Sequence, residues 1–298
     1  MGSVRVAVVG HVEWVEFARV PHVPSAGEIL HASSFFAVPA GGGPVTAVQL
    51  MRLAGACTFF TGLGDDELGH RTLQGLRDLG LRVEARFRPE AQRRAFTYLD
   101  DRGERTITVM GDRLGPSGDD DLPWDELAGY DAVYFTAGDA GALRRARAAR
   151  VVVAALRAKP VLLEAGVRID AVIGSARDAG ETYEPIEPAP DTVVMTASSA
   201  GGTWSTSDGR TGRWDPVPVP GPVADAYGCG DSFAGGLTYG LGAGMPLEEA
   251  LDLGARCGAT CLTGHGPYER QLTLEPEGSA SGGRSAIAPG GPPVDPPA

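Results

Sequence analysis

The residues best suited to chemistry form a glycine-rich turn with a carboxylate, Asp225-Ala226-Tyr227-Gly228-Cys229-Gly230-Asp231-Ser232-Phe233. Gly228 and Gly230 have no side chain, so a ligand can approach the backbone closely. The apolar stretch 232–242 predicts a buried helix directly after the turn, and the N–H groups and dipole at its start attract anions. A carboxylate inside such an anion site is unusual. Asp231 is therefore a candidate general base, taking a proton from a hydroxyl that attacks a phosphoryl group.

The alternative for this segment is an ordinary helix cap, in which Asp231 serves only the N–H groups of the first turn. A second glycine-rich turn, Gly41-Gly42-Gly43-Pro44, precedes a helix predicted over 45–54. Glycines suit a close approach to a ligand, and proline is favoured at the first helical position. Taken alone, this second turn is more typical of a simple loop that enters a helix.

Short apolar runs and helical patterns alternate along the chain. Strands are predicted over 4–10, 58–62, 132–136, 151–156, 161–163, 171–174 and 193–196, and helices over 45–54, 67–79, 140–149, 232–241 and 247–262. This alternation is typical of an α/β fold with a mostly parallel sheet and helices on both faces. Ligands in such folds bind beyond the carboxyl ends of the strands.

Two segments, 13–38 and 94–110, interrupt this alternation and look like β ribbons, the second with a hairpin pattern around a polar turn that contains Gly103. We expect the two ribbons to meet as one small sheet over the active site. The alternative is a pair of surface hairpins without a gating role. From residue 275 onward the chain is dense in Gly, Pro and Ser, so 275–298 is predicted to be disordered and 1–274 to be the folded domain.

Composition narrows the classes of partner. The formal net charge of −12 disfavours binding to nucleic acids and to anionic membranes. No apolar run approaches the roughly 20 residues that span a bilayer. The four cysteines show no disulfide framework, so we interpret them as buried thiols of a cytoplasmic protein with a small-molecule substrate.

The run from Asp225 to Phe233 resembles the second signature of the PfkB (ribokinase-like) family of ATP-dependent carbohydrate and nucleoside kinases, Asp-Thr-x-Gly-Ala-Gly-Asp-Ser/Thr-Phe. The resemblance implies a ribokinase-like three-layer αβα sandwich with a small β lid. It implies that Asp231 is the catalytic base and that the backbone of Gly228, Cys229 and Gly230 forms an anion hole. It also implies that Asp225 supports the turn and helps to seat a monovalent cation such as K⁺.

The turn at 41–43 resembles the first signature of the family, Gly-Gly-x-x-x-Asn, in which the glycines face the sugar. Thr46 stands at the Asn position, and a hydroxyl offers fewer hydrogen bonds than an amide. In the family, an Asp in the first lid segment binds sugar hydroxyls, and Val15 stands at that position in this sequence. Because neighbours in an extended segment alternate faces, Glu13 would point the same way and is the candidate replacement. The alternative for Glu13 is a solvent-facing lid residue.

On the nucleotide side, the family's Asn-x-x-Glu motif, which orders Mg²⁺, aligns with Ser175-Ala176-Arg177-Asp178 and leaves Asp178 as its carboxylate. The loop expected to contact ATP follows a strand that ends near Thr196. It offers Ser198 and Gly201 as further ATP contacts. The cofactors implied by the resemblance are ATP and Mg²⁺.

The sequence thus predicts an ATP-dependent kinase that phosphorylates a hydroxyl of a sugar or sugar-like metabolite. One alternative is a nucleoside kinase of the same family, in which Trp14 and Phe17 would stack on the base. The other is a noncatalytic ligand sensor on a kinase scaffold, since Val15 and Thr46 replace sugar-binding residues. Lid ribbons often pair between subunits in relatives, which implies a homodimer formed through the lid.

Overall fold

The structure is a computed structural model that describes residues 4–274, and the predicted disordered tail lies outside the described residues. Its main element is a sheet in the order β13-β12-β11-β10-β9-β8-β1-β4-β5, parallel except for the β11–β12–β13 meander. The strands are β1 (Val6–Val9), β4 (Thr58–Gly64), β5 (Arg82–Arg88), β8 (Ala132–Phe135), β9 (Val151–Ala155), β10 (Ala171–Ser175), β11 (Thr192–Thr196), β12 (Gly202–Thr206) and β13 (Thr211–Trp214). The central strands read as continuous apolar runs because both of their faces are buried.

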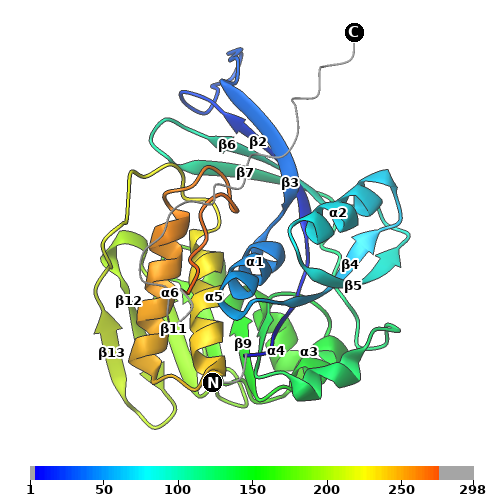
Figure 1. Cartoon of the computed structure of the whole chain (residues 1–298), viewed down its shortest axis with the longest axis vertical. Helices are drawn as coiled ribbons and strands as arrows, with labels where there is room; N and C mark the ends of the chain where they lie inside the picture. Colours follow the sequence, from blue (N-terminus) through cyan, green and yellow to red (C-terminus); the bar gives the residue numbers. More distant parts are fainter. Residues whose placement is uncertain (1–3, 275–298) are drawn as a thin grey trace, which may run out of the picture.

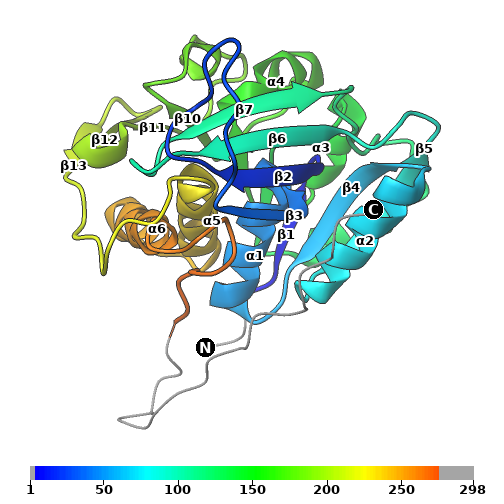
Figure 2. The same ribbon diagram turned by 90° about the horizontal axis from the view of Figure 1, so that it is seen from above.

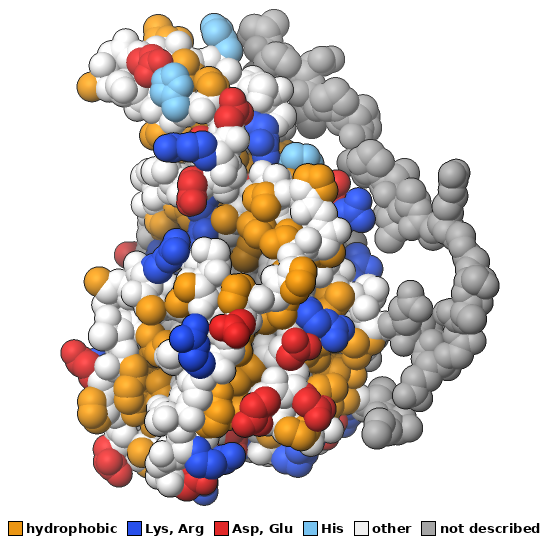
Figure 3. All heavy atoms as spheres, turned by 90° about the vertical axis from the view of Figure 1, so that its left-hand side faces the viewer, with side chains coloured by type: hydrophobic (Ala, Val, Ile, Leu, Met, Phe, Trp, Pro, Cys, Tyr) orange, Lys and Arg blue, Asp and Glu red, His pale blue; other side chains and the backbone are white. Residues whose placement is uncertain are grey.

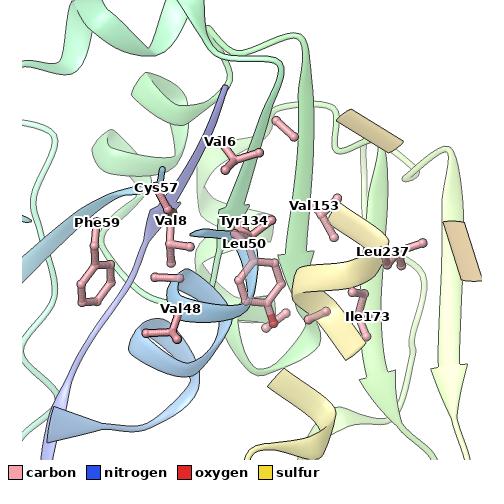
Figure 4. Packing of buried hydrophobic residues seen from close by; sticks show 14 of the residues in the cluster. Val6, Val8, Val48, Leu50, Cys57, Phe59, Tyr134, Val153, Ile173 and Leu237 are labelled. Atoms are coloured by element: carbon pink, nitrogen blue, oxygen red, sulfur yellow. The ribbon is translucent and has the colours of Figure 1, made fainter. Parts of the chain in front are cut away.

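Helices cover both faces of this sheet, as expected for a three-layer sandwich (Figure 1). The layers are α1 (Gly42–Ala54), α2 (Glu67–Asp78), α5 (Cys229–Gly242) and α6 (Leu247–Cys261) on one face, and α3 (Ala140–Ala146) and α4 (Lys159–Ala165) on the other. Short 3₁₀ turns lie at Trp124–Gly129, Leu156–Ala158, Ala179–Glu181 and Ser198–Ala200. Figure 4 shows the first layer, where Val8 and Tyr134 of the sheet pack near Leu50 of α1. Alternate strand residues, such as Val9, face the second layer.

A separate four-stranded sheet, here called the lid, lies over the carboxyl ends of the central strands (Figure 2). Its strands are β2 (Glu13–Arg19), β3 (Ser34–Ala40), β6 (Arg94–Leu99) and β7 (Arg105–Met110), in the order β3-β2-β6-β7. The two ribbons join through parallel pairing of β2 with β6, so the prediction of one sheet from noncontiguous segments is confirmed. Val15, Phe17 and Ala95 on its inner face pack against Tyr227 in the loop before α5.

The strand predicted over 161–163 is wrong, because these residues belong to α4. Pro160 lies at the start of that helix, where its missing N–H costs nothing, and Leu162 faces the core. An apolar run of this length cannot be distinguished from a buried helical turn by pattern alone. Strands β5, β12 and β13 are not evident from the sequence, because they lie at or next to the edges of the sheet and carry many polar residues.

The surface carries mixed charge on the side shown in Figure 3, where basic and acidic side chains are interspersed with apolar ones rather than gathered by sign. This side therefore presents no extended field of one sign that would steer a charged partner. Within residues 4–274, the helices are all too short or too polar to cross a bilayer.

Candidate active site

The turn that opens α5 has the geometry of an anion hole. Gly228 adopts φ of +82°, and a Cβ there would lie 2.9 Å from Cγ1 of Val45, so glycine is required on both grounds. At Gly230, by contrast, an added Cβ would meet no heavy atom within 4 Å. The first N–H groups of the helix have no intrahelical acceptor. They are thus available to a ligand that approaches the open side of Gly230.

Asp225 fixes the shape of this turn. Its carboxylate is fully buried and accepts hydrogen bonds from the backbone N–H groups of Tyr227, at 2.9 Å, and Gly266, at 2.7 Å. These contacts agree with the turn-supporting role that the resemblance implied. The contribution of Asp225 to a monovalent-cation site stays a prediction.

The two glycine turns meet at Asp231. A Cβ added at Gly42 would lie 3.0 Å from Oδ1 of Asp231, so the backbone of the first turn faces the carboxylate of the second. Thr46, buried in α1, donates its hydroxyl hydrogen to the carbonyl oxygen of Asp231 at 3.0 Å. Thr46 therefore ties α1 to α5, and a direct bond between Thr46 and a substrate stays a prediction.

Gly43 is held tightly at this junction, and its replacement by alanine is expected to destabilise the fold. The new Cβ would lie 2.4 Å from the backbone oxygen of His11 and 2.8 Å from Cζ of Phe59. Overpacking of this kind typically costs about 1–3 kcal/mol, more than the gain of at most about 1 kcal/mol in helix propensity. Thermal unfolding should give a lower Tm. Gly230→Ala, which adds the same methyl group in open space, is the control, and an equal Tm change in both variants would contradict this prediction.

The environment of Asp231 suits a base. The residue is only partly buried, and no hydrogen bond to its carboxylate occurs within residues 4–274. Burial raises the pKa of Asp231 to about 6, the charges of Glu181 and Glu13 add to this increase, and those of Arg105 and Arg157 oppose it. A carboxyl group with such a pKa is ionised at neutral pH and is a better proton acceptor than an ordinary aspartate.

Glu13 lies at the start of β2 and faces the first glycine turn. It is 7% exposed, and its carboxylate pairs with Nε of Arg93 at 2.7 Å. A Cβ added at Gly41 would lie 3.6 Å from Oε2 of Glu13. Glu13 is therefore not the solvent-facing lid residue of the alternative interpretation, and its contact with a substrate stays a prediction.

The carboxylate whose charge acts on Asp231 from the β10 side is Glu181 rather than Asp178. Asp178 accepts the N–H of Gly180 and pairs with Arg157 at a partly exposed position. Glu181 accepts the N–H of Ser175 at 2.8 Å and pairs with Nε of Arg157 at 2.7 Å. The role of Asp178 at the nucleotide stays a prediction, and Glu181 is a second carboxylate on the same loop. The signal that could have found Glu181 is the next carboxylate along the same loop.

The predicted nucleotide loop connects β11 to β12. Thr196 ends β11 and donates its hydroxyl to the carbonyl of Gly174 at 3.2 Å. Ser198 has φ of +54° and Gly201 has φ of +76°, so Ser198 takes up a backbone conformation that normally favours glycine. The N–H of Ala197 donates to the carbonyl of Gly201 at 2.8 Å, which closes the turn. The contacts of these residues with ATP stay predictions.

Arg105 of β7 contacts the loop before α5, although nothing in the sequence around it indicates such a role. Its Nη1 donates to the carbonyl of Ala226 at 3.0 Å, and the N–H of Ala226 donates to the carbonyl of Gly103 at 3.1 Å. The lid hairpin is thus bonded to the loop that leads into α5. No local pattern could have indicated this contact, because it joins residues far apart in the sequence.

The aromatic residues proposed to stack on a nucleoside base are packed within the protein. The guanidinium of Arg71 lies over the ring of Trp14, 4.6 Å from its centroid. Phe17 is fully buried, stacked on Phe36 at 4.6 Å and in edge contact with Tyr227 at 4.8 Å. The expectation that Trp14 and Phe17 bind a base is therefore wrong.

Comparisons with known proteins find similarity to carbohydrate kinases. A family model described as pfkB family carbohydrate kinase matches residues 169–273. Fructoselysine 6-kinase of Escherichia coli (strain K12) is 29% identical over 226 residues, 70% of this chain and 83% of that protein. Ribokinase of Lactococcus lactis is 24% identical over 266 residues, 84% of this chain and 87% of that protein.

Solved structures share the fold. The structure of Arabidopsis thaliana ribokinase complexed with ribose and ATP superposes with a TM-score of 0.72 at 18% identity, covering 91% of this chain and 96% of that one. The segment matched by the family model contains the α5 turn with Asp231, the loop with Glu181 and the β11–β12 turn.

Proposed function

We infer the reaction of this chain from its membership in the PfkB family of carbohydrate kinases: it transfers the γ-phosphoryl group of ATP to a hydroxyl of a sugar or sugar-like metabolite. The observation that carries this proposal is the position of Asp231. Its carboxylate lies at the N-terminus of α5, opposite Gly42, with a pKa raised by burial to about 6 and without an internal hydrogen bond in the described chain.

In the proposed mechanism, Asp231 accepts the proton of the acceptor hydroxyl as its oxygen attacks the γ-phosphorus. The backbone N–H groups of Cys229 and Gly230, at the start of α5, donate to the phosphoryl oxygens and offset their charge. Phosphoryl transfer depends mainly on such positioning and electrostatic stabilisation. Gly41 and Gly42 allow the acceptor to approach the carboxylate without a side chain in the way.

Magnesium fits this site as an ion that arrives with the nucleotide. Within residues 4–274, no three His, Cys, Asp or Glu side chains are grouped to hold a metal. Mg²⁺ in kinases is typically held by one or two carboxylates together with phosphate oxygens and water. Glu181 and Asp178 are the carboxylates that would hold it here, and when bound the ion neutralises charge on the phosphates.

The pH dependence should report Asp231. Its carboxyl group acts as a base only when deprotonated, so kcat/KM should fall about tenfold per pH unit below pH 6 and level off above. Arg105→Gln removes a positive charge that lowers the pKa of Asp231, so the acid limb of the profile should move to higher pH. Initial rates measured from pH 5 to 8 check this. A profile that stays flat through pH 6, or a limb that moves to lower pH in the variant, would refute the assignment.

The function is tested by incubating the protein with Mg-ATP and a panel of sugars, sugar derivatives and nucleosides, and measuring ADP together with phosphorylated product. Product formed in equal amount with ADP supports the kinase. Thermal stabilisation by a ligand with ADP at background would instead identify a noncatalytic sensor. A preference for nucleosides over sugars would move the protein to the other substrate class of the family.

Two further observations support proposals on assembly and compartment. Phe35 on the outer face of the lid is 62% exposed, which supports our proposal that two lids pair in a homodimer. All four cysteines are free thiols, which supports the proposal that the protein works in a reducing cytoplasm. Light scattering measures the first, and fractionation of cells measures the second.

A further inference from the structure

A cluster of charged side chains lies where the large sheet passes into the lid. His11 follows β1 and Glu13 begins β2, whereas Arg93 precedes β6 and Arg113 follows β7. Nε of Arg93 pairs with Glu13 at 2.7 Å, and Nε2 of His11 lies 3.7 Å from the same carboxylate. The proposed chemistry assigns no role to the three basic side chains of this cluster.

The cluster has more positive than negative charge. Glu13 is balanced by Arg93, whereas exposed Arg113 makes no hydrogen bond or ion pair in the part of the chain that the structure describes. Partial desolvation of its guanidinium and the charge of Arg93 lower the pKa of Arg113, whereas the charge of Glu13 raises it. Arg113 remains charged at neutral pH because a guanidinium does not lose its proton in proteins. An anion placed beside it would relieve the repulsion between the two arginines.

His11 adds a second, independent sign of a missing partner. It is 6% exposed, and its Nδ1 is buried with no hydrogen-bond partner among residues 4–274. Burial, followed by the charges of Arg113, Arg93 and Arg157, lowers the pKa of His11 to about 3, so the ring is neutral under ordinary conditions. A neutral imidazole has one N–H donor and one acceptor nitrogen. Buried polar atoms without partners are rare in native proteins, and each calls for an explanation.

The cluster lies on the side of Asp231 where the molecule that accepts the phosphoryl group would bind. Glu13 lies against Gly41, and the next residue, Gly42, faces Oδ1 of Asp231. The β11–β12 turn, where we place the nucleotide, belongs to a different part of the sheet, four strands away from β1. A group held by the cluster would therefore belong to the molecule whose hydroxyl reaches Asp231.

We propose that the phosphate acceptor carries an anionic group, a carboxylate or a phosphate, which binds between Arg93 and Arg113 with His11 as a hydrogen-bonding partner. The inference rests on the kinase function proposed above and narrows its substrate class to anionic sugars. A bound anion forms charge-assisted hydrogen bonds with guanidinium groups, and these bonds are stronger than neutral ones.

The test compares neutral sugars, the corresponding sugar acids and the sugar phosphates as acceptors for the wild type and for Arg113→Gln. Sugar acids or sugar phosphates should have the higher kcat/KM, and the better class identifies the anion. Arg113→Gln should raise the KM for that acceptor by about 10- to 100-fold, with the KM for ATP unchanged. Arg102→Gln is the matched control, because the Arg102 side chain is 82% exposed on the β6–β7 turn and, within residues 4–274, its hydrogen bonds and ion pair all go to Asp100.

Each outcome has a distinct meaning. A neutral sugar as the best acceptor, with an unchanged KM in Arg113→Gln, would overturn the proposal, and so would an increase confined to the KM for ATP. Thermal shift with sugar acids and sugar phosphates, in the absence of ATP, separates binding from chemistry. Stabilisation that is lost in Arg113→Gln, without ADP formation from any acceptor, would support the anion site while refuting the kinase function.

Discussion

Asp231→Asn is expected to lower kcat by about 10²- to 10⁴-fold, the usual contribution of a positioned general base. Asparagine has nearly the same shape but cannot accept the proton of the acceptor hydroxyl. The described part of the protein makes no hydrogen bond to the Asp231 carboxylate, so the substitution removes no internal contact. Thr46 bonds to the backbone oxygen of this residue, and that bond is retained. Stability and affinity for ATP should therefore change little.

Three measurements on the same preparation test this expectation: steady-state ADP formation, the Tm, and ATP affinity from titration. Asp252→Asn is the control, because Asp252 is an exposed carboxylate on α6, 3.7 Å from Arg256 and away from the α5 turn. It should retain full activity. Comparable turnover in Asp231→Asn and the wild type would remove Asp231 from the mechanism, and a large loss of Tm would show that its role is structural.

The parts of the site that could be predicted from the sequence are those defined by local backbone chemistry. The positive φ of Gly228 and the helix that follows it are encoded within a few neighbouring residues. Alternating apolar segments likewise predicted the layered fold, because a buried parallel strand and its covering helices have distinct patterns.

The lining of the site could not be predicted, because it depends on how distant segments pair. Val15 and Phe17 face the core only because β2 lies parallel to β6 over the loop that contains Tyr227. This packing covers the ring of Phe17, which the sequence alone suggested would stack on a nucleoside base. Arg105 reaches Ala226 through the same lid geometry. Residues whose role arises from strand pairing across the chain leave no signal in their own neighbourhood.

Gly230→Ala is expected to separate stability from activity in this protein. The added methyl group meets no heavy atom within 4 Å, and alanine is favoured over glycine in the first turn of a helix. The Tm should therefore be equal to that of the wild type or slightly higher. The open space is, however, the space in which the proposed anion hole receives the phosphoryl group. Displacement of that group by about 1 Å typically costs on the order of 10²-fold in rate, so kcat should fall by this amount.

A graded series makes the steric cause testable. Gly230→Val fills more of the same space than Gly230→Ala, so its kcat should be lower still. If the open side of residue 230 receives no ligand, both variants should keep wild-type kinetics. In that case the amides of α5 would have no role in holding phosphate, and the carboxylate of Asp231 would be left without a reacting group beside it. The kinase mechanism therefore depends on a loss of activity that occurs without a loss of stability.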